Sequence, residues 1–178
     1  MSEILKITGD NTPTLFSERF NAHYHSVHGA MTETQVVFID AGLKYVAENL
    51  QHIKILEIGF GTGLNCFATL LKSNELCLKI DFTTIEKYPV QPEISEKFMS
   101  DLNISEEERN LYRQMHNSLW NEPYKVNQDF QLTKLQMDFF ELQLAGAFNL
   151  IYFDAFAPET QPELWTVEMF ELMYRSIE

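Results

Sequence analysis

Cysteine is nearly absent: the 178 residues include only Cys66 and Cys77. Two cysteines without partners at metal-ligand spacing give neither a disulfide framework nor a zinc site, and they indicate a reducing compartment. The sequence also lacks the basic start and apolar run of a signal peptide. No apolar stretch reaches the roughly 18 residues that a membrane helix needs. We therefore expect a cytoplasmic protein with no membrane partner.

Basic residues are also scarce. Thirteen Lys and Arg residues stand against 26 Asp and Glu residues, which gives a formal net charge of −13. This charge argues against a general nucleic-acid coat protein, although a local basic patch can still hold a nucleic-acid substrate. The hydrophobic share of 45% excludes a disordered or low-complexity chain. The length predicts one domain that buries enough surface to fold without a metal or disulfide.

Short apolar runs alternate with helical patterns along the chain. This alternation predicts an α/β fold, a Rossmann-like parallel sheet with helices on both faces. We expect residues 51–178 to form the core and residues 1–50, of which 1–30 are turn-rich, to form an N-terminal extension that packs on it. Four strands leave an apolar sheet edge bare, so we expect the chain to be C-terminally truncated and to lack the closing strands. The expected strands span 53–58, 80–86, 130–137 and 149–154, and the expected helices span 32–49, 64–72, 92–101, 105–118 and 162–178.

The strongest local signal is a strand that runs into three alternating glycines and then into a helix. It reads Glu57-Ile58-Gly59-Phe60-Gly61-Thr62-Gly63-Leu64-Asn65. Glycine allows a sharp turn and a close approach of a ligand, and the first amides of the helix can meet an anionic group. A dinucleotide site would require a further glycine where Leu64 stands. With Glu57 two positions before the first glycine, the segment resembles the S-adenosylmethionine loop of class I methyltransferases.

This resemblance implies a set of cofactor-binding residues. It places Glu57 near the cofactor's amino group, Glu86 on the ribose hydroxyls and Asp138 on the adenine amino group. A carboxylate that accepts two hydroxyl donors suits a ribose. The alternatives are a plain tight turn for the glycines, a solvated acid for Glu86 and a helix N-cap for Asp138. The residues expected to bind the cofactor are Glu57, Gly59, Phe60, Gly61, Gly63, Asn65, Glu86, Lys87 and Asp138.

A second motif, Asp154-Ala155-Phe156-Ala157-Pro158, follows the last apolar strand. Ligands of open α/β sheets bind at the carboxyl ends of the strands, so we expect Asp154 to face the glycine loop. A carboxylate there can orient an amine, accept its proton and stabilise the positive charge that develops on nitrogen. Phe156 can stack on a base. The alternative is a strand-end acid that caps a loop.

Taken together, the motifs resemble one family over nearly the whole chain. They include Tyr24-His25-Ser26, Glu86-Lys87-Tyr88-Pro89 and Pro162-Glu163-Leu164-Trp165-Thr166. The family is the methyltransferase domain of the bacterial tRNA 5-methylaminomethyl-2-thiouridine enzymes, the MnmC family. The resemblance implies methyl transfer from S-adenosylmethionine to the 5-aminomethyl group of a wobble 2-thiouridine in tRNA. It further implies that Asp154 is the catalytic residue and that no metal takes part. A separate flavin-dependent oxidoreductase would supply the aminomethyl substrate. The residues that would contact the substrate are Tyr24, His25, Phe156 and Pro158.

Two other functions stay open at this point. The acidic composition suits a class I methyltransferase of a small-molecule amine, and the missing strands suit a truncated, non-catalytic module that binds cofactor or a partner. A tRNA substrate requires a local basic surface, which we expect Lys87, Arg109, Arg113 and Lys125 to form on one face. We also expect Phe139 and Phe140 in the core. A basic rim around the crevice favours tRNA over a small amine.

Overall fold

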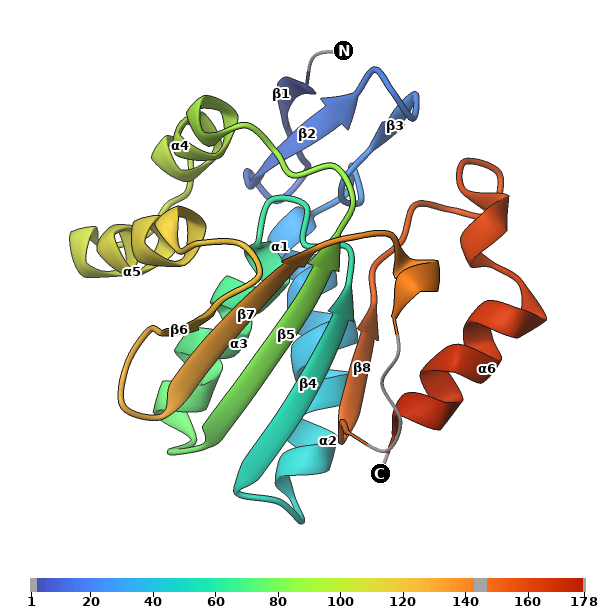
Figure 1. Cartoon of the computed structure of the whole chain (residues 1–178). Coiled ribbons are helices and arrows are strands. Elements are labelled where there is room, and N and C mark those ends of the chain that lie inside the picture. The colour runs from blue at the N-terminus through green and yellow to red at the C-terminus, as the bar shows by residue number, and fades with distance from the viewer. Residues whose placement is uncertain (1–2, 143–146, 178) are drawn as a thin grey trace.

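A computed structural model describes residues 3–142 and 147–177 and shows a mixed α/β fold (Figure 1). Its central sheet has the strand order β6-β7-β5-β4-β8. All neighbouring pairs are parallel except β6 and β7, which are antiparallel. The predicted parallel α/β fold is therefore confirmed, with β6 as an added antiparallel strand. The strands are β4 (His52–Ile58), β5 (Lys79–Glu86), β6 (Pro123–Lys125), β7 (Phe130–Gln136) and β8 (Leu150–Phe153).

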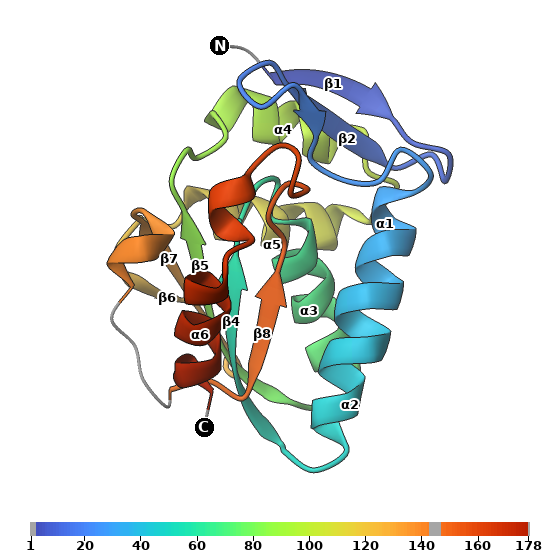
Figure 2. The same ribbon diagram turned by 90° about the vertical axis from the view of Figure 1, so that its right-hand side faces the viewer.

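Helices cover both faces of this sheet. Figure 2 shows α6 and the long N-terminal helix on opposite sides of β8. A capping box starts α5 (Glu106–Asn117): the Ser105 side chain accepts from the Glu108 amide, and the Glu108 carboxylate accepts from the Ser105 amide. None of the helices in the described ranges is long and apolar enough to cross a bilayer. Besides the long N-terminal helix (residues 30–47), the α-helices are α3 (Leu64–Glu75), α4 (Pro92–Ser100), α5 (Glu106–Asn117) and α6 (Val167–Ser176).

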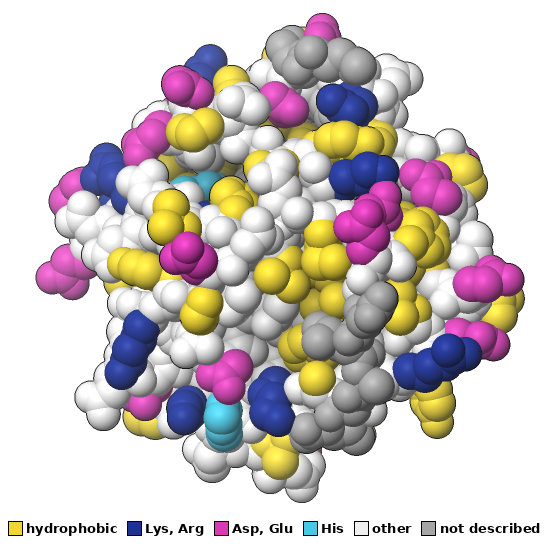
Figure 3. Space-filling model, viewed as in Figure 1, with side chains coloured by type: hydrophobic (Ala, Val, Ile, Leu, Met, Phe, Trp, Pro, Cys, Tyr) yellow, Lys and Arg dark blue, Asp and Glu magenta, His cyan; other side chains and the backbone are white. Residues whose placement is uncertain are grey.

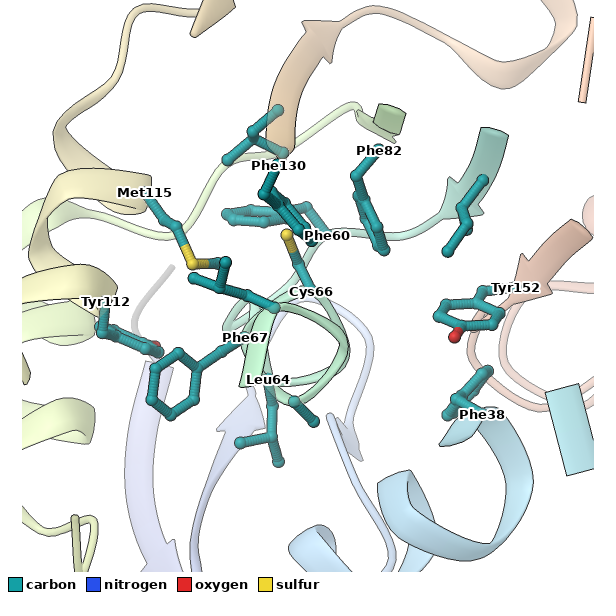
Figure 4. Close-up of a cluster of buried hydrophobic side chains, with 14 of the residues drawn as sticks. Phe38, Phe60, Leu64, Cys66, Phe67, Phe82, Tyr112, Met115, Phe130 and Tyr152 are labelled. Atoms are coloured by element: carbon teal, nitrogen blue, oxygen red, sulfur yellow. The ribbon is translucent and has the colours of Figure 1, made fainter. Parts of the chain in front are cut away.

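The strands divide their side chains between two cores, because successive residues of a strand point to opposite faces. On β4, Ile53 and Ile55 join the larger core, whereas Leu56 and Ile58 join the smaller core beneath α6. Figure 4 shows aromatic rings of the larger core, including Tyr152 of β8 facing Phe38 of the long helix. Their ring centroids are 5.1 Å apart. Glu57 alternates with Ile58, so its carboxyl group points into the side of the larger core.

The long N-terminal helix differs from its prediction. It consists of α1 (Ala30–Glu33), the π-helix η1 (Thr34–Leu43) and α2 (Lys44–Ala47). The helix begins after Gly29, two residues before its expected start, and the Thr32 hydroxyl donates to Asp10. The helix continues through Gly42. A Cβ at Gly42 would lie 3.3 Å from the Tyr152 ring, so this glycine lets the helix approach β8 closely.

Two further segments also differ from the sequence expectations. Residues 1–30 were expected to be turn-rich, yet they contain an antiparallel sheet of β1 (Glu3–Ile7), β2 (Pro13–Ser17) and β3 (Ala22–His23). This sheet lies above the carboxyl ends of the central strands (Figure 1). The expected helix 162–178 is divided into the 3-10 helix η3 (Pro162–Leu164) and α6, because the Thr166 side chain starts a new helix by accepting from the Met169 amide.

Candidate active site

A cavity lies at the carboxyl ends of β4, β5 and β8, where the glycine loop, the loop after β5 and the loop after β8 meet. The small N-terminal sheet closes it from above with side chains from the segment that follows β2. Most of the residues predicted from the sequence come together here. They are Tyr24, His25, Gly59, Phe60, Gly61, Asn65, Glu86, Lys87, Asp138, Asp154 and Phe156.

Three predicted residues do not line this cavity. Glu57 is fully buried in the sheet below the loop. Gly63 faces the Phe60 and His116 side chains, and a Cβ there would come within 2.9 Å of both. Pro158 is exposed on the loop after β8.

The glycine loop approaches other parts of the protein closely. Gly59 has φ of +94°, and a Cβ there would lie 2.6 Å from the backbone oxygen of Asp154. Gly61 has φ of +50°, and its Cβ would lie 3.0 Å from the Tyr24 ring. Both conformations strain a residue that carries a side chain. Glycine is therefore required at these two positions for two reasons: it adopts the positive φ of the turn, and its lack of a side chain leaves room for Asp154 and Tyr24.

Helix α5 fixes the middle of the glycine loop. The backbone oxygen of Thr62 accepts hydrogen bonds from the Tyr112 hydroxyl and from Nε2 of His116, the latter at 2.8 Å. Burial lowers the pKa of His116 to about 4, so the neutral ring carries its proton on Nε2 to donate here. Lys134, only 1% exposed, donates to the backbone oxygen of His116 at 2.8 Å. None of these hydrogen bonds was predicted from the sequence, because each joins residues that lie 18 to 54 positions apart.

Glu86 ends β5 with its carboxylate directed at the loop. Its Oε2 accepts from the Gly61 amide at 3.2 Å and its Oε1 accepts from the Tyr88 amide at 2.7 Å. Burial raises the pKa of this carboxyl, while the amides at Tyr88, Gly61 and Lys87 act against that rise. A carboxylate has about four lone-pair positions, so Glu86 can accept further donors from the cavity.

Asp138 combines two contacts. It caps the 3-10 helix η2 (Phe139–Glu141) by accepting from the Phe140 amide at 3.2 Å, as the capping alternative predicted. It also pairs with the Lys87 ammonium at 2.6 Å. The Lys87 hydrogen bond is the main reason that the pKa of Asp138 is lowered. Asp138 is thus a charged acceptor at the edge of the cavity opposite Asp154.

Asp154 is held by a chain of two hydrogen bonds. Its Oδ2 accepts from the Asn65 side-chain amide at 2.7 Å, and the Asn65 oxygen accepts from the Thr34 hydroxyl at 2.7 Å. Burial raises the pKa of Asp154 to about 7; the Asn65 bond opposes this rise and the Glu33 charge adds to it. The side chain is only partly exposed, and it lines the cavity. A carboxyl that titrates near neutrality can both accept and return a proton.

Glu57 has a different environment. Neither of its carboxyl oxygens has a hydrogen-bond partner by geometry, although Thr84 and Asn65 are its polar neighbours. Burial raises its pKa well above the usual range, and the charges of Asp154 and Glu86 add to this effect. Glu57 is therefore a buried acid beneath the loop, and two carboxyls, Glu86 and Asp154, remain beside the loop in the cavity.

Aromatic rings form one wall of the cavity, and they include Phe20, which sequence reasoning missed, beside the predicted Tyr24 and Phe156. Phe20 lies 4.7 Å from Phe156 and 6.0 Å from Tyr88, measured between ring centroids, and Tyr24 lies 5.3 Å from Phe156. Phe140 was expected in the core, but it is 52% exposed and lines the cavity. A wall of this kind suits a flat, partly apolar ligand.

The expected basic cluster does not form an open patch. The Arg109 guanidinium donates to the backbone oxygens of Met99 and Leu102 at 2.6 and 2.7 Å. Arg113 pairs with Glu96 and Glu106 at 3.4 and 3.5 Å. Lys87 is bound to Asp138 as described above. Three of the four cations therefore bind acceptors of the protein, and Lys125 is exposed on β6, apart from them.

Comparison with known proteins agrees with this geometry. Residues 104–178 match the model of a family described as S-adenosyl-L-methionine-dependent methyltransferase. The chain is 31% identical, over 175 residues, to the tRNA 5-methylaminomethyl-2-thiouridine biosynthesis bifunctional protein MnmC of Leptospira borgpetersenii serovar Hardjo-bovis (strain JB197), an alignment that covers 91% of this chain and 26% of that protein. The protein of the same name from Campylobacter concisus (strain 13826) is 26% identical over 164 residues, covering 90% of this chain and 26% of its own length. The chain thus spans about a quarter of the length of these relatives.

A solved structure gives the same fold. The crystal structure of MNMC2 from Aquifex aeolicus superposes with a TM-score of 0.78 and 24% sequence identity, covering 99% of this chain and 57% of that one. The family resemblance read from the motifs is therefore confirmed: the chain is similar to MnmC proteins over nine-tenths of its length and, through residues 104–178, to S-adenosyl-L-methionine-dependent methyltransferases.

Proposed function

We propose that this chain transfers a methyl group from S-adenosylmethionine to the 5-aminomethyl group of a wobble 2-thiouridine in tRNA. One observation carries the proposal: Glu86, the glycine loop and the titratable Asp154 face a single cavity. The similarity to proteins named for 5-methylaminomethyl-2-thiouridine synthesis in tRNA supports this choice of substrate.

The donors and acceptors around the cavity fit S-adenosylmethionine. Glu86 has lone pairs left for ribose hydroxyls, and Asp138 offers a charged acceptor for an adenine amino group. The cofactor supplies a methyl group that is electrophilic because it is bound to a positive sulfur. We assign cofactor binding to Gly59, Phe60, Gly61, Gly63, Asn65, Glu86, Lys87 and Asp138. Glu57 lies buried below them, where its carboxyl group can form a hydrogen bond with the amino group of the cofactor.

Asp154 acts on the amine in this proposal. A primary amine is largely protonated at neutral pH, and a protonated amine has no lone pair with which to attack carbon. A carboxylate whose pKa is about 7 can take that proton and keep the nitrogen oriented by hydrogen bonding. The amine lone pair then forms the new N–C bond while the bond from carbon to sulfur breaks. Once that proton has passed to solvent, the Asp154 carboxylate also stabilises the positive charge that forms on nitrogen.

The base of the substrate would rest on the aromatic wall. Phe156 and Tyr24 meet edge to face across the cavity, and His25 lies behind Tyr24 with its ring nitrogens engaged by the hydroxyls of Thr14 and Thr62. Burial lowers the pKa of His25 to about 4, so its ring is neutral. Unpaired bases are commonly held by stacking on such rings. Pro158 would contact the substrate from the exposed loop after β8.

The wider setting follows from the same proposal. Residues 1–50 would act as an extension that supplies Tyr24 and His25 to a core formed by residues 51–178. A separate flavin-dependent oxidoreductase would supply the aminomethyl group. We place the reaction in the cytoplasm, where tRNA is found and where the unpaired Cys66 and Cys77 would stay reduced.

Single-turnover methylation tests the function. The 178-residue chain and labelled S-adenosylmethionine are mixed with tRNA that carries 5-aminomethyl-2-thiouridine, with the same tRNA carrying unmodified uridine, and with simple primary amines. We expect label only in the first tRNA, and none with Asp154→Ala on the time scale of the wild-type reaction. Transfer to simple amines but not to tRNA would instead identify a small-molecule methyltransferase.

A further inference from the structure

We propose that Arg19, stacked on Tyr88 at the mouth of the cavity, forms the contact for the ribose–phosphate backbone beside the reacting nucleotide. This inference rests on the proposed function, because it takes single-stranded RNA as the ligand. It names a docking point that the basic residues predicted from the sequence do not supply.

The geometry places a cation at the outer end of the aromatic wall. The Arg19 guanidinium carbon lies 4.0 Å from the centroid of the Tyr88 ring. Tyr88 is 38% exposed and contacts Phe20, which in turn contacts Phe156 inside the cavity. The rings thus run from Phe156 through Phe20 to Tyr88, and Arg19 covers the last of them at the surface. A nucleotide whose base enters the cavity would have its backbone at this end.

Tyr88 is fixed in place by the cofactor side of the site. Its backbone amide donates to Glu86 Oε1 at 2.7 Å, so the carboxylate that we assign to the ribose of the cofactor also holds the backbone at Tyr88. Arg19 also acts on the cavity from outside. Burial and the charges of Glu86 and Glu3 raise the pKa of Tyr24, whereas the positive charge of Arg19 lowers it. Arg19 therefore lies within electrostatic reach of the cavity.

Arg19 differs from the other three arginines of the chain. Arg109, Arg113 and Arg175 all donate to oxygen atoms of the protein. Among the described residues Arg19 has no carboxylate partner, and its guanidinium packs on the face of Tyr88. Stacking leaves the edge of a guanidinium free to donate, and this planar edge matches a phosphate. On the face shown in Figure 3, Lys and Arg side chains stand next to hydrophobic ones beneath the N-terminal strands.

The net charge of −13 makes such a local contact necessary. An acidic surface repels RNA over most of its area, so few phosphates can be neutralised. Each neutralised phosphate of a single strand contributes about 0.7 to the slope of log K against log salt concentration. We therefore expect the affinity for RNA to depend only weakly on salt, and to depend on it still less when Arg19 is replaced by a neutral residue.

Fluorescence anisotropy with a labelled anticodon stem-loop, in the presence of S-adenosylhomocysteine, tests the contact without requiring turnover. Arg19→Ala should weaken binding about 10-fold and reduce the salt slope by about 0.7, because it removes one charge-assisted phosphate contact. Arg19→Lys should keep the slope and lose part of the affinity, since lysine lacks the planar, stacked donor edge. Tyr88→Leu should lose affinity with less change in the slope.

Lys6→Ala is the matched control. Lys6 is an exposed cation of the same small sheet, but it does not line the cavity. An equal loss of RNA affinity for Lys6→Ala would overturn the proposal, because any exposed cation of this region would then contribute as much. An unchanged salt slope for Arg19→Ala would also overturn it, because the phosphate would then be bound by other residues.

A second measurement separates this inference from the proposed function. The ratio of kcat/KM for the stem-loop to kcat/KM for the 5-aminomethyl-2-thiouridine nucleoside should fall about 10-fold in Arg19→Ala, because the nucleoside has no phosphate. A parallel loss for both substrates would show that Arg19 only shapes the cavity. If neither substrate is methylated by the wild type while RNA binding still depends on Arg19, the proposed reaction fails and the docking contact stands.

Discussion

Asn65 donates its side-chain amide to Oδ2 of Asp154 at 2.7 Å, and through this bond the first turn of α3 holds the carboxyl group that follows β8. The two residues are 89 positions apart in the chain. Thr34 fixes Asn65 in turn, because its hydroxyl donates to the Asn65 oxygen and leaves the nitrogen facing Asp154. The orientation of Asn65 is therefore set by the π-helical stretch of the long helix, a helix form that often occurs at functional sites.

The first prediction concerns Asp154 itself. Asp154→Ala should lower the single-turnover rate of methyl transfer at least ~100-fold, the effect usual for a positioned acid–base group. Cofactor affinity measured by calorimetry should change far less, since the contact is with the amine. Asn65→Leu should cause a smaller loss of rate, and Thr34→Val a smaller one still. A wild-type rate for Asp154→Ala would leave Asp154 as a loop cap only.

The second prediction is a pH profile. The pKa of Asp154 is about 7, and in the proposed reaction the carboxylate is the active form. The logarithm of kcat/KM should therefore rise with a slope of about one as pH increases to about 7 and then level off. Asp154→Asn should have lower activity and lack this rise. A wild-type profile that stays flat through neutrality would mean that another group accepts the proton.

The raised pKa of Asp154 also makes a prediction about stability. Between about pH 4 and pH 7 the folded protein binds this proton and the unfolded chain does not, so the contribution of Asp154 to stability falls as pH rises through that window. The difference in Tm between Asp154→Asn and the wild type should therefore grow in favour of the variant from pH 4 to pH 7. His25 and His116 have the opposite dependence, but they are present in both proteins and cancel in the difference.

Glu86 gives the fourth prediction. Glu86→Ala should weaken S-adenosylmethionine binding by roughly 1–3 kcal/mol, because it removes a charged acceptor and frees the Gly61 and Tyr88 amides. Glu86→Gln, which keeps one acceptor oxygen, should lose less. Glu163→Ala is the control, since Glu163 lines the same cavity but is exposed on the far side from the loop. Equal losses for Glu86→Ala and Glu163→Ala would indicate general electrostatics rather than a ribose contact.

The glycine loop gives the last prediction. Gly61→Ala should reduce both Tm and cofactor affinity, because its Cβ would lie 3.0 Å from Tyr24 at a φ of +50°. Adding Tyr24→Leu should restore part of the Tm but not all of it, since the backbone strain remains. Gly42→Ala is the control for Gly61→Ala, because it adds the same methyl group away from the cofactor loop. Its Cβ would press on Tyr152 in the core, so it should change Tm without a matching change in cofactor affinity.

The part of the site that could be predicted from the sequence follows one rule, that parallel strands end at the same edge of a sheet. Glu86 and Asp154 each come at or just after the end of an apolar run, so their meeting at the glycine loop needed no knowledge of the tertiary structure. The helix start at Ser105 and the loop glycines were equally local signals. These features depend on residues only a few positions apart.

The remaining parts depend on contacts that leave no local pattern. The hydrogen bond from Tyr112 to Thr62 joins residues 50 positions apart, and each residue alone has an ordinary sequence context. The small N-terminal sheet was missed because its turns were visible but its pairing was not, and Phe20 was missed with it. Phe140 was placed in the core by hydrophobicity alone. Since Asp138 starts a tight 3-10 helix there, Phe139 points inward and Phe140 points to the cavity.

The acidic lining of the cavity has a consequence for turnover under the proposed reaction. S-adenosylmethionine carries a positive sulfur, whereas the product that remains after transfer is an uncharged thioether. Glu86, Asp138 and Asp154 line the cavity in which that charge would pass from sulfur to the substrate nitrogen. The attraction between these carboxyl groups and the ligand therefore weakens once the methyl group has left. The cavity therefore binds the thioether product less tightly than it binds S-adenosylmethionine. Transfer of the methyl group thus itself promotes release of the product.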